Sequence, residues 1–311
     1  MGTKWCPGIL FARSNRRSTL PDQSRTGFAP LATLGWGQAP RPTNTMIHSL
    51  LFFLTCPIAA PVAAPILPPE PTPVLFQDEE EKPDKRPEIK ELVDAFAGHI
   101  KKRGDEDREA LAKVDSMLGE WEMCGPKDRK DIIRILSRSL NEKRKADKDG
   151  RPNNMLFVAV AVAFGRMGPE SAPELMKWID NKKHRKDVKL QRQLVLSLGM
   201  TVDDKGRKVL IDLLVNKYAA IQAAAAEALG HYSKKDQKVR KEVFEEILKV
   251  LNSAYNAKEG ASTDREAQER YDVIAASMIT TLQGLSGATI RTPNDWRKWW
   301  NDNKRKKWDD V

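Results

Sequence analysis

The chain has 311 residues, of which 40% are hydrophobic and 31% charged, and its formal net charge is +10. A core can be packed from this composition, in one large domain or two ordinary ones. The basic excess is modest, and a solvated helical surface accounts for it better than a nucleic-acid site does. Of the three cysteines only Cys124 lies in the part expected to fold, which excludes an internal disulfide there.

Residues 1–45 are rich in Arg, Pro, Ser, Thr and Gly and show neither helical nor strand periodicity. We predict a disordered extension, because no hydrophobic face is available for burial. Met46 follows, and residues 46–64 have the shape of a secretory signal peptide, with an apolar stretch from Leu50 to Ala60 and small residues after it. Translation that starts at Met46 would leave the extension outside the protein.

Two readings of this segment place the remainder of the chain outside the cytoplasm. In the favoured one, Met46 is the start and the signal peptide is cleaved. In the other, Met1 is the start and residues 49–67 are an uncleaved membrane anchor, although prolines 57, 61 and 65 make a poor spanning helix. A cytosolic protein with a disordered apolar tail is the third reading, and a lipoprotein modified at Cys56 is a weaker fourth.

Residues 65–87 form a predicted linker, rich in proline and carrying the acidic run 78–81. Proline-rich chain stays extended and like charges repel one another, so this stretch is expected to act as a spacer.

From residue 88 onward apolar residues recur at helical spacing. Ile89, Phe96 and Ile100 lie on one such stripe, and further stripes follow through residues 110–118 and 132–140. No segment shows sustained strand alternation. The spacing therefore predicts an all-α domain over 88–301.

Glycines follow several of these stripes at Gly165, Gly199, Gly230 and Gly287, 34, 31 and 57 residues apart. A polar insertion over 256–265 lengthens the last interval. We predict that these glycines end the first helix of each unit in the left-handed conformation that glycine adopts without strain. Helical hairpins that recur every 30-odd residues indicate a stacked solenoid, in which neighbouring units bury one another's apolar stripes.

Two segments carry a more specific resemblance. Residues 164–175, Phe-Gly-Arg-Met-Gly-Pro-Glu-Ser-Ala-Pro-Glu-Leu, and the alanine-rich run 219–230 are similar to the short bacterial HEAT (armadillo-like) repeat of exported proteins. The likeness is good over 154–255, loose over 264–301 and poor over 88–150. It implies a right-handed α-α superhelical solenoid of about five hairpins that binds other proteins.

The end of the chain combines a helix start at Thr292-Pro293 with Trp296, Trp299 and Trp300 on one helical face. Such tryptophans could bind a sugar, a peptide or a base, but we favour a terminal helix that covers the last repeat, because solenoids need caps. Residues 302–311 follow as a basic tail.

The sequence indicates no catalytic, metal or cofactor site. His99, His184 and His231 are scattered, and none lies in a nucleophile or zinc motif. His184 is predicted to be a solvated residue of the basic run 182–186. That run and the run 304–307 beside Trp308 are the two sequence features that point toward nucleic acid.

We therefore expect a non-catalytic, exported scaffold that binds a protein partner, without a small-molecule cofactor and with membrane contact only through an uncleaved N-terminal segment. One alternative is an accessory protein that binds envelope polysaccharide through exposed tryptophans and basic residues. A less favoured alternative is a nucleic-acid-binding DNA glycosylase of the HEAT-like type. The sequence leaves the ligand-binding residues open.

Overall fold

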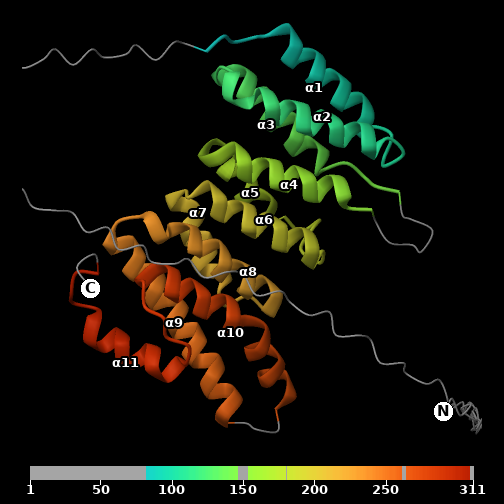
Figure 1. Cartoon of the computed structure of the whole chain (residues 1–311). Coiled ribbons are helices and arrows are strands. Elements are labelled where there is room, and N and C mark those ends of the chain that lie inside the picture. The colour runs from blue at the N-terminus through green and yellow to red at the C-terminus, as the bar shows by residue number, and fades with distance from the viewer. Residues whose placement is uncertain (1–81, 146–152, 180, 261–263, 309–311) are drawn as a thin grey trace, which may run out of the picture. The chain divides into compact units, whose positions relative to one another are not determined.

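The computed structural model describes residues 82–145, 153–179, 181–260 and 264–308, and within these ranges every regular element is a helix (Figure 1). The predicted all-α class is confirmed for this part of the chain. Short 3-10 turns occupy Trp121–Met123, Gly168–Ser171 and Gly230–Lys234. The α-helices are α1 (Pro87–Ile100), α2 (Asp107–Glu120), α3 (Pro126–Ser139), α4 (Met155–Met167), α5 (Ala172–Ile179), α6 (Val188–Thr201), α7 (Asp204–Leu213), α8 (Ala219–Leu229), α9 (Gln237–Gly260), α10 (Arg265–Ser286) and α11 (Pro293–Asn303).

The predictions for residues 1–45, for the signal peptide or anchor at 46–64 and for most of the linker lie outside the described residues. The last part of the predicted linker lies inside them, and it contacts the helices. The backbone N–H of Gly125 donates to the carbonyl of Pro83 at 3.2 Å, and that of Lys127 donates to Asp84 Oδ1 at 2.8 Å. The packed region therefore includes residues just before 88.

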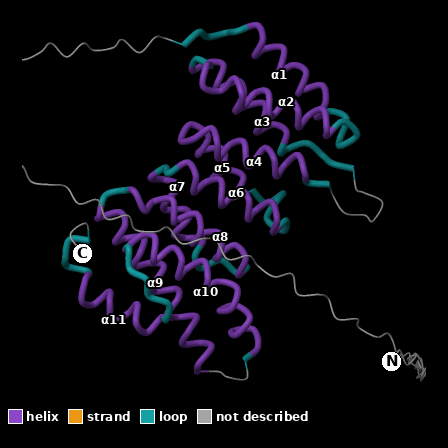
Figure 2. The backbone as a smooth tube through the Cα atoms, viewed as in Figure 1, coloured by secondary structure: helices purple, strands orange, loops and turns teal. Residues whose placement is uncertain are grey.

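The helices pack in two rows of alternate helices (Figure 2). In the first row α2 contacts α4, α4 contacts α6, α6 contacts α8, and α8 contacts α10. In the second row α5 contacts α7 and α7 contacts α9, while α11 packs on α9. Helices of one row also contact those of the other, as α6 does with α5 and α7. Helix α6 thus packs against helices of both rows.

The apolar stripes predicted from the sequence form the core between these rows. Ile89, Phe96 and Ile100 of α1 are buried, as are Leu194 and Leu198 of α6. Residues 155–179 have the length and hydropathy of a membrane span. In the structure this stretch is two helices and a 3-10 turn, and much of its apolar surface is buried inside the protein.

Three of the four predicted glycine caps are wrong. Helix α4 continues past Gly165 and ends before Gly168, which has φ 78°, and α6 continues past Gly199 and ends with Val202 in the left-handed region. Gly230 is right-handed at φ −59°. Only Gly287, with φ 77°, is the predicted left-handed cap.

The glycines instead allow close approach between successive helices of the first row. A Cβ at Gly165 would lie 3.1 Å from Ser197 Cα on α6, and one at Gly199 would lie 2.6 Å from Ala228 Cα on α8. At Gly230 a Cβ would lie 3.6 Å from Thr281 Oγ1 on α10, which is an ordinary contact. The spacing of Gly165 and Gly199 therefore follows helix crossings, and not helix ends.

Gly199→Ala is expected to lower the free energy of unfolding by about 1–3 kcal/mol, because the new methyl would meet the Ala228 backbone and force α6 and α8 apart. Urea unfolding followed by circular dichroism measures the change. The control is Gly98→Ala in α1, where nothing lies within 4 Å, and a gain of about 0.5–1 kcal/mol is expected from helix propensity. Equal effects at the two positions would contradict the close-approach role.

The polar insertion at 256–265 lies mostly within two helices. Helix α9 runs on to Gly260 and α10 begins at Arg265, so most of the inserted residues lengthen these helices. Tyr255 and Tyr271 lie with ring centroids 5.8 Å apart on the two extended ends.

Candidate functional site

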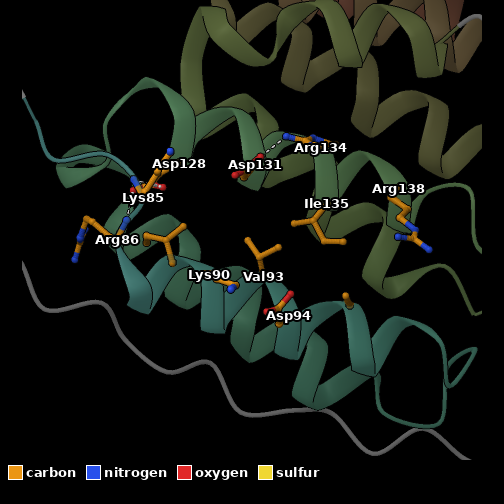
Figure 3. Close-up of a pocket in the computed structure, with 12 residues that line it drawn as sticks. Lys85, Arg86, Lys90, Val93, Asp94, Asp128, Asp131, Arg134, Ile135 and Arg138 are labelled. Atoms are coloured by element: carbon orange, nitrogen blue, oxygen red, sulfur yellow. Dashed lines mark hydrogen bonds and ion pairs between the residues drawn. The ribbon is translucent and has the colours of Figure 1, made fainter.

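A hollow of about 540 Å³ lies between α1 and α3, near the start of the packed region (Figure 3). Its floor is apolar and consists of Ile89, Val93, Ala97 and Ile135. Charged side chains surround this floor and come from both helices and from the segment before α1: Lys85, Arg86, Lys90, Asp94, Asp128, Asp131, Arg134 and Arg138. An apolar floor with a charged rim suits a ligand that has an apolar part and polar flanks.

One end of this groove is fixed by Asp128 in the first turn of α3. Its carboxylate accepts hydrogen bonds from the backbone N–H groups of Lys85, at 3.0 Å, and Arg86, at 3.1 Å. The Arg86 side chain in turn donates to Glu120 Oε2 at 2.8 Å. These contacts hold the N-terminus of α1 against α3, and the distance between the two walls is therefore set by the fold.

The remaining rim charges are only partly neutralised within the protein. Asp131 pairs with Arg134 on the exposed face of α3, and Arg138 lies 3.9 Å from Glu142. Lys90 and Asp94, on α1, form no ion pair with any other described residue. These groups are available to a ligand, since water is their main alternative partner.

A second hollow of about 580 Å³ lies on the other side of α3, between α3 and α5, and shares Arg134 and Arg138 with the first. Its wall includes Trp178, whose indole Nε1–H donates to Ser137 Oγ at 2.9 Å. The Ser137 hydroxyl donates to Glu174. The two hollows together therefore form a grooved surface that crosses α1, α3 and α5.

His184 is not the solvated residue that the sequence suggested. Its side chain is buried, and its ring lies 5.3 Å from the ring of Phe157 and 5.6 Å from that of Trp178. Nε2 lies 2.7 Å from the carbonyl oxygen of Leu140, which can only accept, so Nε2 carries the proton. The preceding Lys183 donates through Nζ to the carbonyls of Asn141 at 2.5 Å and Glu142 at 3.1 Å.

These two residues of the basic run therefore satisfy the carbonyl groups that follow α3, where cations are favourable. Burial lowers the pKa of His184, while its hydrogen bond to Leu140 raises it to a smaller extent. Burial likewise lowers the pKa of Lys183. The run 182–186 is thus partly engaged inside the protein, and sequence reasoning missed this because the apolar partners of His184 come from other helices.

His184 should make the protein less stable at acidic pH. Since its folded-state pKa lies below its ordinary value near 6.5, the unfolded chain takes up the proton at higher pH than the folded protein does. The free energy of unfolding should therefore fall as the pH drops from 7.5 to 5, and His184→Gln should show a smaller fall. Urea unfolding across this range tests the difference, with His231→Gln, at an exposed histidine, as the control. Identical slopes for wild type and His184→Gln would refute it.

The C-terminal tryptophans are organised around Phe244 of α9. The Phe244 ring lies 5.5 Å from Trp296, 5.3 Å from Trp299, 5.1 Å from Trp300 and 5.2 Å from Trp308. Trp296 and Trp308 are buried, and Trp299 and Trp300 are half-buried. The aromatic cluster covers the end of the packed helices, which is the cap arrangement favoured from the sequence.

No catalytic constellation is found in the described part of the chain. His99 Nδ1 lies 2.8 Å from Glu106 Oε2, but no described Ser or Cys hydroxyl or thiol is hydrogen-bonded to this pair. No group of His, Cys, Asp or Glu residues within the described ranges has the geometry of a metal site. Burial raises the pKa of the Cys124 thiol, which disfavours the reactive thiolate.

Comparison with protein-family models, with curated proteins and with solved structures found no significant match.

Proposed function

We propose that this chain is a non-catalytic, protein-binding scaffold built from HEAT-like helical hairpins, about five of them, stacked as a right-handed superhelical solenoid. Three observations support the proposal. The helices pack in rows of alternate helices, and Gly165 and Gly199 recur at the crossings within one row. The segments 164–175 and 219–230 resemble the short bacterial HEAT repeat.

The groove beside α3 is the proposed binding surface, and its partner is a protein segment with apolar residues flanked by acidic ones. The single observation that carries this is the continuity of the two hollows through Arg134 and Arg138. A surface that crosses three helices suits an extended or helical segment better than a compact small molecule. Among the side chains that line the two hollows, Lys and Arg outnumber Asp and Glu, so an acidic segment is electrostatically complementary.

The two alternatives receive less support. Trp296 is buried and Trp299 and Trp300 are half-buried against Phe244, so the three rings do not form the exposed face that polysaccharide binding would use. Lys183 and His184 satisfy carbonyls after α3, which removes part of the basic run that a nucleic-acid enzyme would use.

The groove is tested by selecting a displayed library of random 15-residue peptides on the full chain and measuring the affinity of enriched peptides by fluorescence polarisation. We expect sequences in which acidic residues flank apolar ones. The variant Arg134→Glu/Arg138→Glu should weaken their binding at least tenfold. The matched variant Lys182→Glu/Lys186→Glu makes the same change of charge outside the groove and should bind as the wild type does. Equal loss in both variants, or no acidic enrichment, contradicts the proposal.

We further propose that the scaffold acts outside the cytoplasm, after cleavage of a signal peptide that starts near Met46. The support is the apolar stretch Leu50 to Ala60 and the small residues that follow it. Mass spectrometry on fractionated native cells should find a mature N-terminus between about Pro61 and Gln77 in a fraction outside the cytoplasm. An intact chain from Met1 in the cytosol would overturn this part of the proposal and leave the groove test unaffected.

A further inference from the structure

Two basic segments that lie far apart in the sequence are joined at the C-terminal end of the described region. The carbonyl oxygen of Lys306 accepts a hydrogen bond from Gln237 Nε2 at 2.7 Å and another from Lys241 Nζ at 2.5 Å. Gln237 is the first residue of α9, whereas Lys306 follows α11. This contact bridges 69 residues and fixes the basic tail on the N-terminus of α9.

The tail is held by further contacts on both sides of Lys306. The Trp308 indole Nε1–H donates to the carbonyl of Asn303 at 3.1 Å, and the ring is buried. The guanidinium of Arg240 lies 5.9 Å from this ring and the ammonium of Lys241 lies 5.5 Å from it, both within cation–π range. The tail up to Trp308 is therefore part of the packed structure and presents its cations at a fixed place.

We call the resulting surface the basic patch. It consists of Lys235, Lys238, Lys241, Lys304, Arg305, Lys306 and Lys307. All of these are exposed except Lys241, which is half-buried.

Five acidic residues neighbour these seven cations in the sequence. Asp236 accepts a hydrogen bond from the Val239 N–H at 3.0 Å and so caps α9, and Glu242 is paired with Arg207. Asp302 is exposed beside the tail, and Asp309 and Asp310 follow it in the sequence. The patch retains a positive excess after all of these are counted.

The chemistry of the patch favours lipid phosphate groups over a single-stranded nucleic acid. Single-stranded nucleic acids are held by aromatic rings on which bases stack. The aromatic rings beside the patch are engaged within the protein: Trp308 is buried, and Trp299 and Trp300 are half-buried against Phe244. What remains is a cluster of flexible ammonium and guanidinium groups, which is the pattern that anionic lipid headgroups attract.

We propose that the basic patch binds the headgroups of an anionic phospholipid membrane. This choice of polyanion rests on the proposed export, because both a signal peptide and an uncleaved anchor around Leu50 to Ala60 would bring the chain to a membrane. This binding is electrostatic and lies at the surface, because the patch has no exposed apolar or aromatic side chain to insert. It leaves the groove beside α3 free for a protein partner.

The test is cosedimentation of the full chain with vesicles of phosphatidylglycerol and phosphatidylcholine at a ratio of about 30:70, and with pure phosphatidylcholine vesicles, at low and high salt. The patch variant is Lys235→Gln/Lys238→Gln/Arg305→Gln/Lys307→Gln, which removes four exposed cations without removing the hydrogen bonds to Lys306. The control variant is Lys182→Gln/Lys186→Gln/Lys189→Gln/Lys208→Gln, which removes four exposed cations elsewhere. Circular dichroism verifies that both fold.

The expected result is binding to the anionic vesicles that weakens with salt and falls at least about tenfold in the patch variant but not in the control. Binding supplied by the apolar segment would appear equally on pure phosphatidylcholine and cancels between the variants. The proposal would be overturned if the patch variant bound the anionic vesicles as the wild type does, or if the two variants lost binding equally. Loss of binding to a DNA duplex in the patch variant, with no change on vesicles, would assign the patch to nucleic acid instead.

Discussion

Phe244→Ala is expected to lower the free energy of unfolding by about 3–5 kcal/mol, the usual cost of deleting a buried aromatic ring. The ring is fully buried and lies within 5.5 Å of four tryptophan rings, those of Trp296, Trp299, Trp300 and Trp308. Pairs of this kind add about 0.5–1.5 kcal/mol each beyond the area that they bury. Removal of Phe244 should therefore detach α11 and the tail from α9.

Urea unfolding followed by two probes distinguishes local detachment from global loss of structure. Tryptophan fluorescence should change at a lower urea concentration than circular dichroism in the variant, because the cap opens while the other helices remain folded. Tyr255→Ala is the control, since it removes a half-buried aromatic from the same helix, and it should cost about 1 kcal/mol or less. The central role of Phe244 in the tryptophan cluster would be contradicted if the two transitions coincided and the free energy of unfolding fell by less than about 1 kcal/mol.

Arg144→Met is expected to cost a similar amount, about 3–5 kcal/mol, because it leaves the buried Asp107 carboxylate without its partner. The side chain of Arg144 is 3% exposed and that of Asp107 is 11% exposed. The guanidinium also lies 5.2 Å from the Phe157 ring, a contact that the methionine side chain can partly retain. The ion pair joins the start of α2 to the segment after α3.

The neighbouring pair Lys145–Asp105 supplies a matched control, since it joins the same two segments but its side chains are about 60% exposed. Lys145→Met should change the free energy of unfolding by at most about 1 kcal/mol. The double variant Arg144→Met/Asp107→Leu should recover much of the loss, because no unpaired buried charge remains. If both single variants cost the same, burial does not decide the strength of these pairs. Urea unfolding at constant pH and salt measures all of them.

Helical periodicity predicted the helices well, because the buried face of each helix sets the spacing of its apolar residues along the sequence. The stripe Ile89, Phe96 and Ile100 is the buried face of α1, and the Trp296 helix begins at Thr292-Pro293 as expected, with the Thr292 hydroxyl accepting from the Asp295 N–H at 3.2 Å. Both features depend on residues within one or two helical turns. A single sequence contains that information in full.

The roles of individual glycines and histidines could not be predicted in the same way. Gly199 recurs at the repeat spacing, but a period does not distinguish a helix end from a helix crossing, and the atoms that decide belong to Ala228. His184 lies in a basic run, and its burial depends on Phe157 and Trp178 of other helices. The groove was missed for the same reason, since its two walls come from α1 and α3.

The four tryptophans that cover Phe244 are synthesised after it. Residues 296–308, which supply the four tryptophans, leave the ribosome about 50 to 65 residues after Phe244, a delay on the order of 3–13 s at ordinary rates of synthesis. During this interval α9 presents an uncovered aromatic ring and its neighbouring core residues to the solvent. The nascent chain therefore has a defined period in which a chaperone that holds apolar segments would recognise it, and this period closes when the tail folds back onto α9.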